Sequence, residues 1–170
     1  DIINVDALRS LIDDFTEITG MCIGMTDNRG KILASSGWRE ICSEFHRAHP
    51  ETRKNCEISD TTLANGVTPG SYKLYRCKNN IWEAASPIVI GDKRLGKIFL
   101  GQYFYADETI DYNAFRDQAQ RYGFDEEKYL AALDKVPRFS RETVEYAIRF
   151  ITKLAAIISE LSLGNFKLSR

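Results

Sequence analysis

Three strand-like segments follow one another in the middle of the chain, and they constrain the fold more than any other feature. They read SYKLYRC, IWEAASPIVIG and LGKIFLGQYFY, and the turn GDKR separates the last two. Their β-branched and aromatic residues favour strands. Pro87 indicates an edge or a bulge in the second segment, because proline has no N–H to donate to a neighbouring strand.

The N-terminal part predicts a helix followed by a hairpin. Apolar residues recur at helical spacing within residues 1–20, and Gly20 ends the pattern. Met21–Met25 and Lys31–Ser35 are two short strand-like segments on either side of a turn. Gly30 in that turn suits a positive φ angle, which favours a hairpin.

Helical patterns fill most of the remaining sequence. Residues 38–65 are expected to be helical, in two pieces, because Pro50 fits the start of a helix better than its middle. DYNAFRDQAQRYG and DEEKYLAALDKV predict two further helices, the second ended by Pro137. This order predicts an α+β fold: a PAS-like five-stranded antiparallel sheet with inserted helices and flanking N- and C-terminal helices.

The last predicted helix, residues 140–163, carries a coiled-coil-like seam. The apolar residues of this seam recur at steps of four and three: Ala147, Ile151, Leu154, Ile158 and Leu161. The seam predicts a homodimer formed through this helix. The alternative is a helix packed on its own domain, which a seam of about three heptads does not exclude.

Composition disfavours several classes of function. The chain has 170 residues and a formal net charge of -1, which does not suggest a nucleic-acid-binding surface. No apolar run approaches the roughly 20 residues that a membrane span needs, and no signal peptide leads the chain. The four cysteines therefore favour a reducing, cytoplasmic location. The absence of an initial methionine indicates a piece of a longer protein.

Residues 41–56, ICSEFHRAHPETRKNC, place two cysteines around both histidines of the chain. Cys42 and His46 lie four residues apart, so on a helix they would share one face. With Cys56 and Cys77 they could form a Cys3His zinc site, and the three thiolates could instead hold an iron–sulfur cluster. The lack of closely spaced ligand pairs argues against a structural zinc site.

Two other hypotheses remain open for these cysteines. A reversible Cys42–Cys56 or Cys56–Cys77 disulfide would make a redox sensor, provided that the sulfurs lie close in space. Alternatively, the three cysteines line a ligand pocket as small apolar residues, while Cys22 lies in the core. Asp60 could accept hydrogen bonds from such a ligand or pair with an arginine such as Arg53.

Several stretches, taken in order, resemble the PocR sensory domain, a PAS-related ligand-binding module of bacterial and archaeal transcription regulators and sensor kinases. The resemblance covers roughly residues 5–105. The matching stretches are TGMCIGMTDNRGKILASSG, ICSEFH, CEISD and YRCKNNIWEAASPIVIGDKRLGKIFLGQYF. The chain departs from the family at Lys78, where a histidine is usual, which counts against metal binding.

The resemblance implies a sensory domain that binds a small organic molecule. The sequence identifies no cofactor, and this function requires none. It also implies a covalently linked effector outside this sequence, either a DNA-binding domain or a histidine kinase. We expect one domain over residues 1–170, with an N-terminal helix (1–20), a sensor core (21–139) and a C-terminal signalling helix (140–163). No phosphate-binding loop or nucleophile elbow is visible, so an enzyme is not expected.

The pocket is expected between the sheet and the inserted helices. Sensor pockets are concave and mostly apolar, with a few polar groups that orient the ligand. Gln102 stands out because a buried amide needs a partner, which either a ligand or the backbone could supply. The predicted ligand-binding residues are Trp38, Cys42, Phe45, His46, Cys56, Tyr72, Tyr75, Cys77, Trp82, Gln102 and Phe104.

Alternation along the last strand predicts which of its side chains share a face. One face would carry Phe99, Gly101 and Tyr103, and the other Leu100, Gln102 and Phe104. One of the two sets is expected to face the inserted helices.

Overall fold

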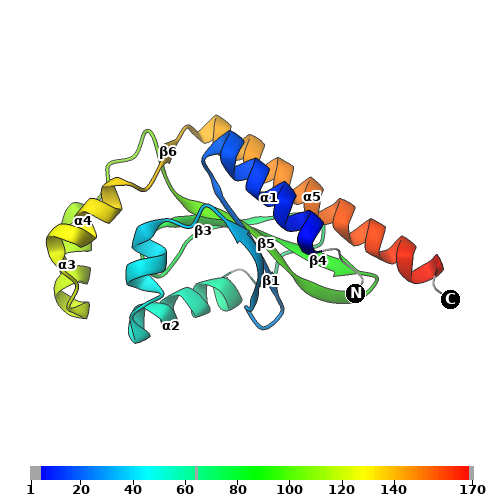
Figure 1. Ribbon diagram of the computed structural model, residues 1–170, viewed down its shortest axis with the longest axis horizontal. Coiled ribbons are helices and arrows are strands. Elements are labelled where there is room, and N and C mark those ends of the chain that lie inside the picture. Colours follow the sequence, from blue (N-terminus) through cyan, green and yellow to red (C-terminus); the bar gives the residue numbers. More distant parts are fainter. Residues whose placement is uncertain (1–4, 64, 169–170) are drawn as a thin grey trace.

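A computed structural model describes residues 5–63 and 65–168. Its centre is a sheet in which the strands run in the order β2-β1-β5-β4-β3, and all neighbours in this order are antiparallel (Figure 1). The strands are β1 (Cys22–Asp27), β2 (Ile32–Ser36), β3 (Lys73–Arg76), β4 (Trp82–Ile90), β5 (Lys93–Tyr105) and the two-residue β6 (Arg138–Phe139), parallel to the end of β5. The predicted α+β fold with a PAS-like antiparallel sheet is therefore confirmed.

Two local features of the strands follow from glycine and proline chemistry. Gly30 has a φ of 82° in the turn between β1 and β2, as the hairpin prediction required. β4 is an internal strand, but the ladder that joins it to β3 ends at the pair Lys73–Ala85. Pro87 therefore lies beyond β3, where that side of β4 needs no N–H donor.

The segment expected as two helices forms three short pieces. They are the π-helix η1 (Ile41–His46), the α-helix α2 (Pro50–Ile58) and the π-helix η2 (Ser59–Leu63). Pro50 begins α2 as predicted, and His49 caps it by accepting a hydrogen bond from the backbone N–H of Glu51. π-helical turns are rare and occur often at functional sites, and nothing in the sequence pattern predicts them.

Helices α1 (Val5–Thr19) and α5 (Arg141–Leu168) lie side by side over one face of the sheet (Figure 1). Phe15 and Phe150 stack between them, with ring centroids 5.1 Å apart. The core under these helices includes Ile12, Ile98, Leu100, Ile151 and Ile158.

Most of the apolar seam predicted on α5 does not form an exposed surface that a second chain could contact. Ala147, Ile151 and Ile158 are buried against the sheet of their own domain, and Leu154 packs partly against the same core. The exposed apolar residues of α5 are Tyr146, Phe150, Ile157 and Leu161. The structure thus adopts the alternative, a helix packed on its own domain, and a homodimer through α5 stays a prediction.

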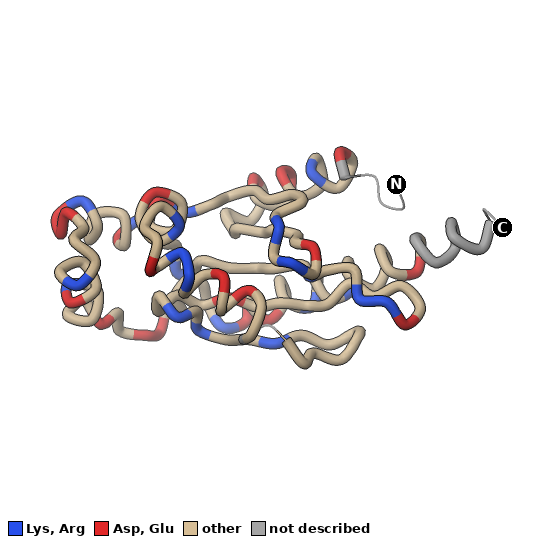
Figure 2. Tube along the Cα trace, turned by 90° about the horizontal axis from the view of Figure 1, so that it is seen from below, with Lys and Arg blue, Asp and Glu red and all other residues tan. Residues whose placement is uncertain are grey.

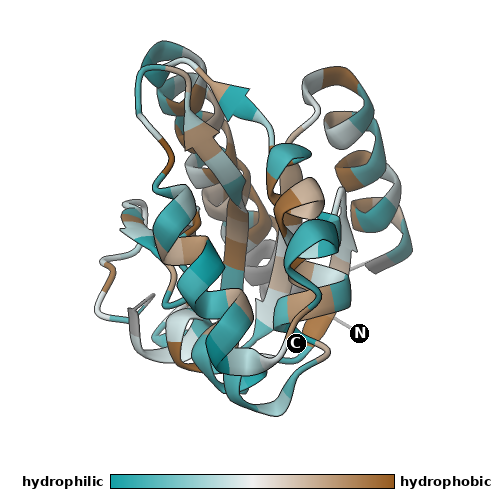
Figure 3. Ribbon diagram, turned by 90° about the vertical axis from the view of Figure 1, so that its left-hand side faces the viewer, coloured by the Kyte–Doolittle hydropathy of each residue, from teal (hydrophilic) through white to brown (hydrophobic). Residues whose placement is uncertain are grey.

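The helices α3 (Tyr112–Tyr122) and α4 (Glu126–Asp134) pack beside η1 around a second core. Hydrophobic residues gather between the sheet and the helices, and hydrophilic residues cover the outer helix faces (Figure 3). Within residues 5–63 and 65–168, no helix combines the length and the apolar character that a membrane crossing requires.

Candidate functional site

A cavity lies on the face of the sheet opposite α1 and α5. Its polar lining comes from Thr26, Arg47, Asp60, Glu83 and Gln102, and the other residues around it are Cys22, Gly24, Met25, Ile32, Trp38, Phe99 and Gly101. The cavity has a volume of about 30 Å³. That is room for one or two water molecules, so a larger ligand requires side chains to move.

Glu83 on β4 places a carboxyl group at this cavity. It faces Gly101 on β5, and a Cβ atom at Gly101 would lie only 2.8 Å from the Glu83 Cγ atom. The Oε2 atom of Glu83 is buried and has no hydrogen-bond partner. Burial, reinforced by the Asp60 charge and opposed by Arg47, raises the pKa of Glu83 to about 8. The carboxyl is therefore largely protonated near neutral pH and can donate a hydrogen bond.

Gln102 sits at a β-bulge, because Gly101 pairs with Glu83 while Tyr103 already pairs with Trp82. Its φ of 62° is unusual for a residue other than glycine, and such strain is common at binding sites. The side chain is buried, and its Oε1 atom accepts a hydrogen bond of 2.7 Å from the backbone N–H of Arg39. The sequence indicated the importance of Gln102 but not its backbone conformation.

The bulge also changes which side chains of β5 share a face. Leu100 and Tyr103 both lie in the core under α1 and α5, while Phe99 and Gly101 face the cavity. The simple alternation predicted for this strand is therefore wrong from Gln102 onward. One extra residue in the strand turns every side chain that follows it to the opposite face of the sheet.

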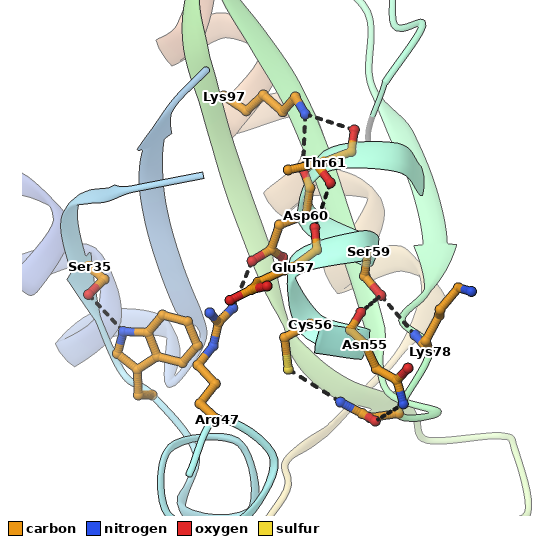
Figure 4. Close-up of polar contacts among 12 residues, drawn as sticks. Ser35, Arg47, Asn55, Cys56, Glu57, Ser59, Asp60, Thr61, Lys78 and Lys97 are labelled. Carbon is orange, nitrogen blue, oxygen red and sulfur yellow. Dashed lines mark hydrogen bonds and ion pairs between the residues drawn. The ribbon is translucent and has the colours of Figure 1, made fainter. Parts of the chain in front are cut away.

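Arg47 follows η1 and connects several parts of the site. Its Nη2 atom lies 2.8 Å from Asp60 Oδ2 on η2, as Figure 4 shows. Its guanidinium carbon lies 4.6 Å from the centre of the Trp38 ring, within the range of a cation–π contact. The Trp38 indole is itself held by a hydrogen bond from Nε1 to Ser35 Oγ. Asp60 thus pairs with Arg47 rather than with Arg53.

Cys42, His46, Cys56 and Cys77 come together around a smaller cavity of about 10 Å³. This cavity also touches Arg47, Asp60, Glu83 and Gln102, so the two cavities share four residues. All four cysteines of the chain are buried and free. Burial raises the pKa of Cys56 to about 11 and the pKa values of Cys42 and Cys77 further, so these thiols carry little thiolate.

His46 is held as a neutral side chain. Its Nε2 atom lies 2.6 Å from the hydroxyl of Tyr129, which also accepts a hydrogen bond from Gln118. Burial lowers the pKa of His46 to about 3. Across residues 5–63 and 65–168, no group of three or more His, Cys, Asp or Glu side chains is arranged to hold a metal ion.

The other predicted pocket residues are not among those around the two cavities. Tyr75 is buried against Ala85 and Phe99, but it pairs with Glu83 across β3 and β4, and its buried hydroxyl, which acts on the Glu83 carboxyl, has no hydrogen-bond partner. Phe45 and Phe104 belong to the core under α3 and α4, Trp82 donates a hydrogen bond to Glu108, and Tyr72 is exposed. The structure therefore brings together Trp38, Gln102, the three cysteines and His46 from the predicted set.

Sequence reasoning missed Glu83 and Arg47. Glu83 had a detectable signal, because it is a charged residue within the otherwise apolar stretch IWEAASPIVI. Arg47 had none, since a cation in a polar helical segment usually faces solvent.

An antiparallel PAS-like sheet with a small cavity beneath inserted helices is the architecture of a sensory domain. The sequence model described as "Sensory domain found in PocR" matches residues 1–163. The chain belongs to this family of sensory domains, in agreement with the resemblance seen in the sequence. No curated protein matches the chain.

Proposed function

We propose that this domain reversibly binds a small polar organic molecule in the cavity between the sheet and the π-helices, without converting it. The observation that carries the proposal is the buried Oε2 atom of Glu83, which faces the cavity and has no partner. Buried polar atoms are nearly always hydrogen-bonded, so an unpartnered atom at a cavity indicates that a bound molecule supplies the missing contact.

The lining defines the chemistry of this ligand. Protonated Glu83 offers a donor and an acceptor, and these suit a hydroxyl or carbonyl group. Ile32 and Phe99 provide an apolar wall for a short hydrocarbon part. Charged Arg47 and Asp60 neutralise each other, so the polar end favours a neutral molecule.

We further propose that α5 relays occupancy to an effector outside this sequence. Tyr103 directly follows the bulge at Gln102 and packs in the same core as Ile151 of α5. The hydroxyl of Ser159 on α5 accepts a hydrogen bond of 3.1 Å from the backbone N–H of Val89 on β4. A ligand that changes the bulge would therefore bias the position of α5, provided that it binds the two arrangements unequally.

Native mass spectrometry of the protein purified from cells tests the binding proposal. We expect the wild-type protein to carry a small organic molecule, and Glu83→Ala to lose it while keeping its circular dichroism spectrum. Glu127→Ala, at an exposed carboxylate in the first turn of α4, is the matched control and should keep the molecule. A molecule retained by the Glu83→Ala variant would refute the proposed site, and a bound metal ion would favour a metal sensor instead.

A further inference from the structure

A second and larger depression lies on the other side of Arg47. Its volume is about 680 Å³, within the roughly 300–1,000 Å³ of typical small-molecule sites. One wall is the turn between β1 and β2, and the other is formed by α2 and η2. The residues around this outer basin are Arg29, Gly30, Lys31, Arg47, Arg53, Lys54, Glu57, Ile58, Asp60 and Thr61.

The outer basin is strongly cationic. Five cationic side chains face two carboxylates there, although the whole chain has a formal net charge of -1. Cationic and anionic residues are interspersed along most of the chain (Figure 2), so this excess arises from the way the turn and α2 converge. Among the described residues, Arg29, Lys31 and Lys54 form no ion pair. Several uncompensated cations around a depression create a field that attracts anions.

Arg47 is the wall between the outer basin and the inner cavity. Both spaces touch its side chain and that of Asp60, with which it pairs. The Nε atom of Arg47 is buried and has no hydrogen-bond partner. The guanidinium therefore has unused capacity to bind oxygen atoms, and guanidinium groups bind phosphate and carboxylate oxygens in pairs.

We infer that the outer basin is a second ligand site, for a small anion with at least two negative charges, and that it is coupled to the inner cavity through Arg47. An anion in the basin competes with Asp60 for the guanidinium and draws it away from the Trp38 ring. This movement loosens the wall of the inner cavity and leaves Asp60 available to an inner ligand. Coupling between two sites is reciprocal, so an inner ligand would also strengthen anion binding.

Calorimetric titration with pyrophosphate, at constant ionic strength set with sodium chloride, tests the anion site directly. We expect saturable binding of one pyrophosphate per chain. The double substitution Lys31→Ala/Lys54→Ala should weaken binding at least tenfold, because it removes two exposed cations of the basin. The control Lys73→Ala/Lys93→Ala makes the same change of charge at exposed sites outside the basin and should change affinity less than twofold.

A parallel titration with citrate identifies the anionic group. Preference for pyrophosphate assigns the site to phosphate oxygens, and preference for citrate assigns it to carboxylates. No saturable heat with either anion, or equal weakening in both double variants, would overturn the anion site.

Fluorescence of Trp38 tests the coupling, which rests on the proposed inner site. In a Trp82→Phe background Trp38 is the remaining tryptophan, and its ring is in contact with Arg47. We expect pyrophosphate to shift its emission with the same midpoint as the calorimetric titration. Pyrophosphate binding without any change in Trp38 emission would refute the coupling. Neither measurement uses an inner ligand, so failure of the proposed function would not affect either readout.

Discussion

At the scale of single residues, the inner cavity gathers groups that are costly to bury. Glu83, Asp60 and Arg47 lie within one small space with the amide of Gln102. Burial raises the pKa of Asp60 as well as that of Glu83, and the Arg47 charge opposes both effects. The protonation state of the site is therefore linked to the stability of the domain.

The stability of the domain should depend on Glu83 in a defined pH window. The pKa of Glu83 is raised from 4.5 to about 8 in the folded protein, so the folded state binds more protons than the unfolded state in between. The free energy of unfolding that Glu83 contributes through this difference in proton binding is fully present below about pH 4.5. It is lost as the pH rises toward 8. We expect wild-type stability, measured by urea unfolding relative to Glu83→Gln, to fall by about 1–3 kcal/mol between about pH 5 and pH 8.

The comparison with Glu83→Gln isolates one carboxyl group, because glutamine is neutral throughout this range. His46, with its pKa lowered to about 3, contributes a pH dependence of the opposite sign, and it does so equally in both proteins. A constant difference between the two proteins across the window would show that Glu83 ionises normally.

The backbone at Gln102 should favour glycine over alanine. Its φ of 62° is available to glycine at little cost, and both substitutions remove the same side-chain contact to Arg39. We expect Gln102→Gly to be more stable than Gln102→Ala by about 1 kcal/mol in urea unfolding.

Gln120 provides the matched control for this comparison, because it is an exposed residue inside α3. There the order should reverse, with alanine more stable than glycine by about 1 kcal/mol. The same order at both positions would contradict the left-handed conformation of Gln102.

At the residue level, the sequence points to side chains that are unusual for their surroundings, and their role in binding stays a prediction. Gln102 was recognised as a polar residue at the end of an apolar strand, and Cys42, His46, Cys56 and Cys77 were grouped from their order along the chain. Arg47 was not recognised, because its role depends on Trp38 and Asp60, which reach it only through the fold.

At the scale of elements, strands and helix stops were predictable and helix geometry was not. Alternation and turn residues defined the β1–β2 hairpin and the three later strands, and Pro50 defined the start of α2. The π-helical form of η1 and η2 depends on packing between these turns and the sheet, which no periodicity in the sequence encodes. The bulge in β5 has the same origin.

Helix α5 illustrates how a seam of apolar residues can serve the interior of one domain. Ile151 is fully buried, whereas Ile157 is 51% exposed on the same helix. We expect Ile151→Ala to destabilise the domain by about 2–5 kcal/mol and Ile157→Ala to change stability by less than about 0.5 kcal/mol. Urea unfolding of both variants provides the measurement. Equal destabilisation by the two alanine substitutions would mean that α5 packs differently from this structure.

The oligomeric mass of the same variants tests the dimer prediction on the exposed face of α5. A homodimer formed through α5 would use the exposed residues Tyr146, Phe150, Ile157 and Leu161, so Ile157→Ala should weaken it.

At the scale of the whole molecule, the sheet separates two apolar cores. β5 contributes to both, with Leu100 in the core under α1 and α5 and Phe104 in the core beside α3 and α4. The overall α+β architecture could be predicted, because the order of strands and helices along the chain follows from local patterns. The order of the strands within the sheet could not, since it depends on pairing between segments far apart in the sequence. The position of the cavity could be predicted only as a layer between sheet and inserted helices.

The thiols report on opening of the whole domain. Cys22, Cys42, Cys56 and Cys77 are each no more than 8% exposed, and burial raises the pKa of every one of them. We expect Ellman's reagent to react very slowly with the native protein and to titrate all four thiols after denaturation. Rapid reaction of one thiol in the native state would contradict this burial and would favour redox sensing.

The contact between Gly101 and Glu83 has a consequence for the history of this domain. A side chain at position 101 would collide with Glu83, which lies directly opposite on β4. A lineage that kept the carboxyl would therefore keep the glycine, and one that replaced the carboxyl by a small residue would be free to gain a side chain at position 101. The two positions should covary among homologues, and the pair present in each would reveal which molecules its cavity accepts.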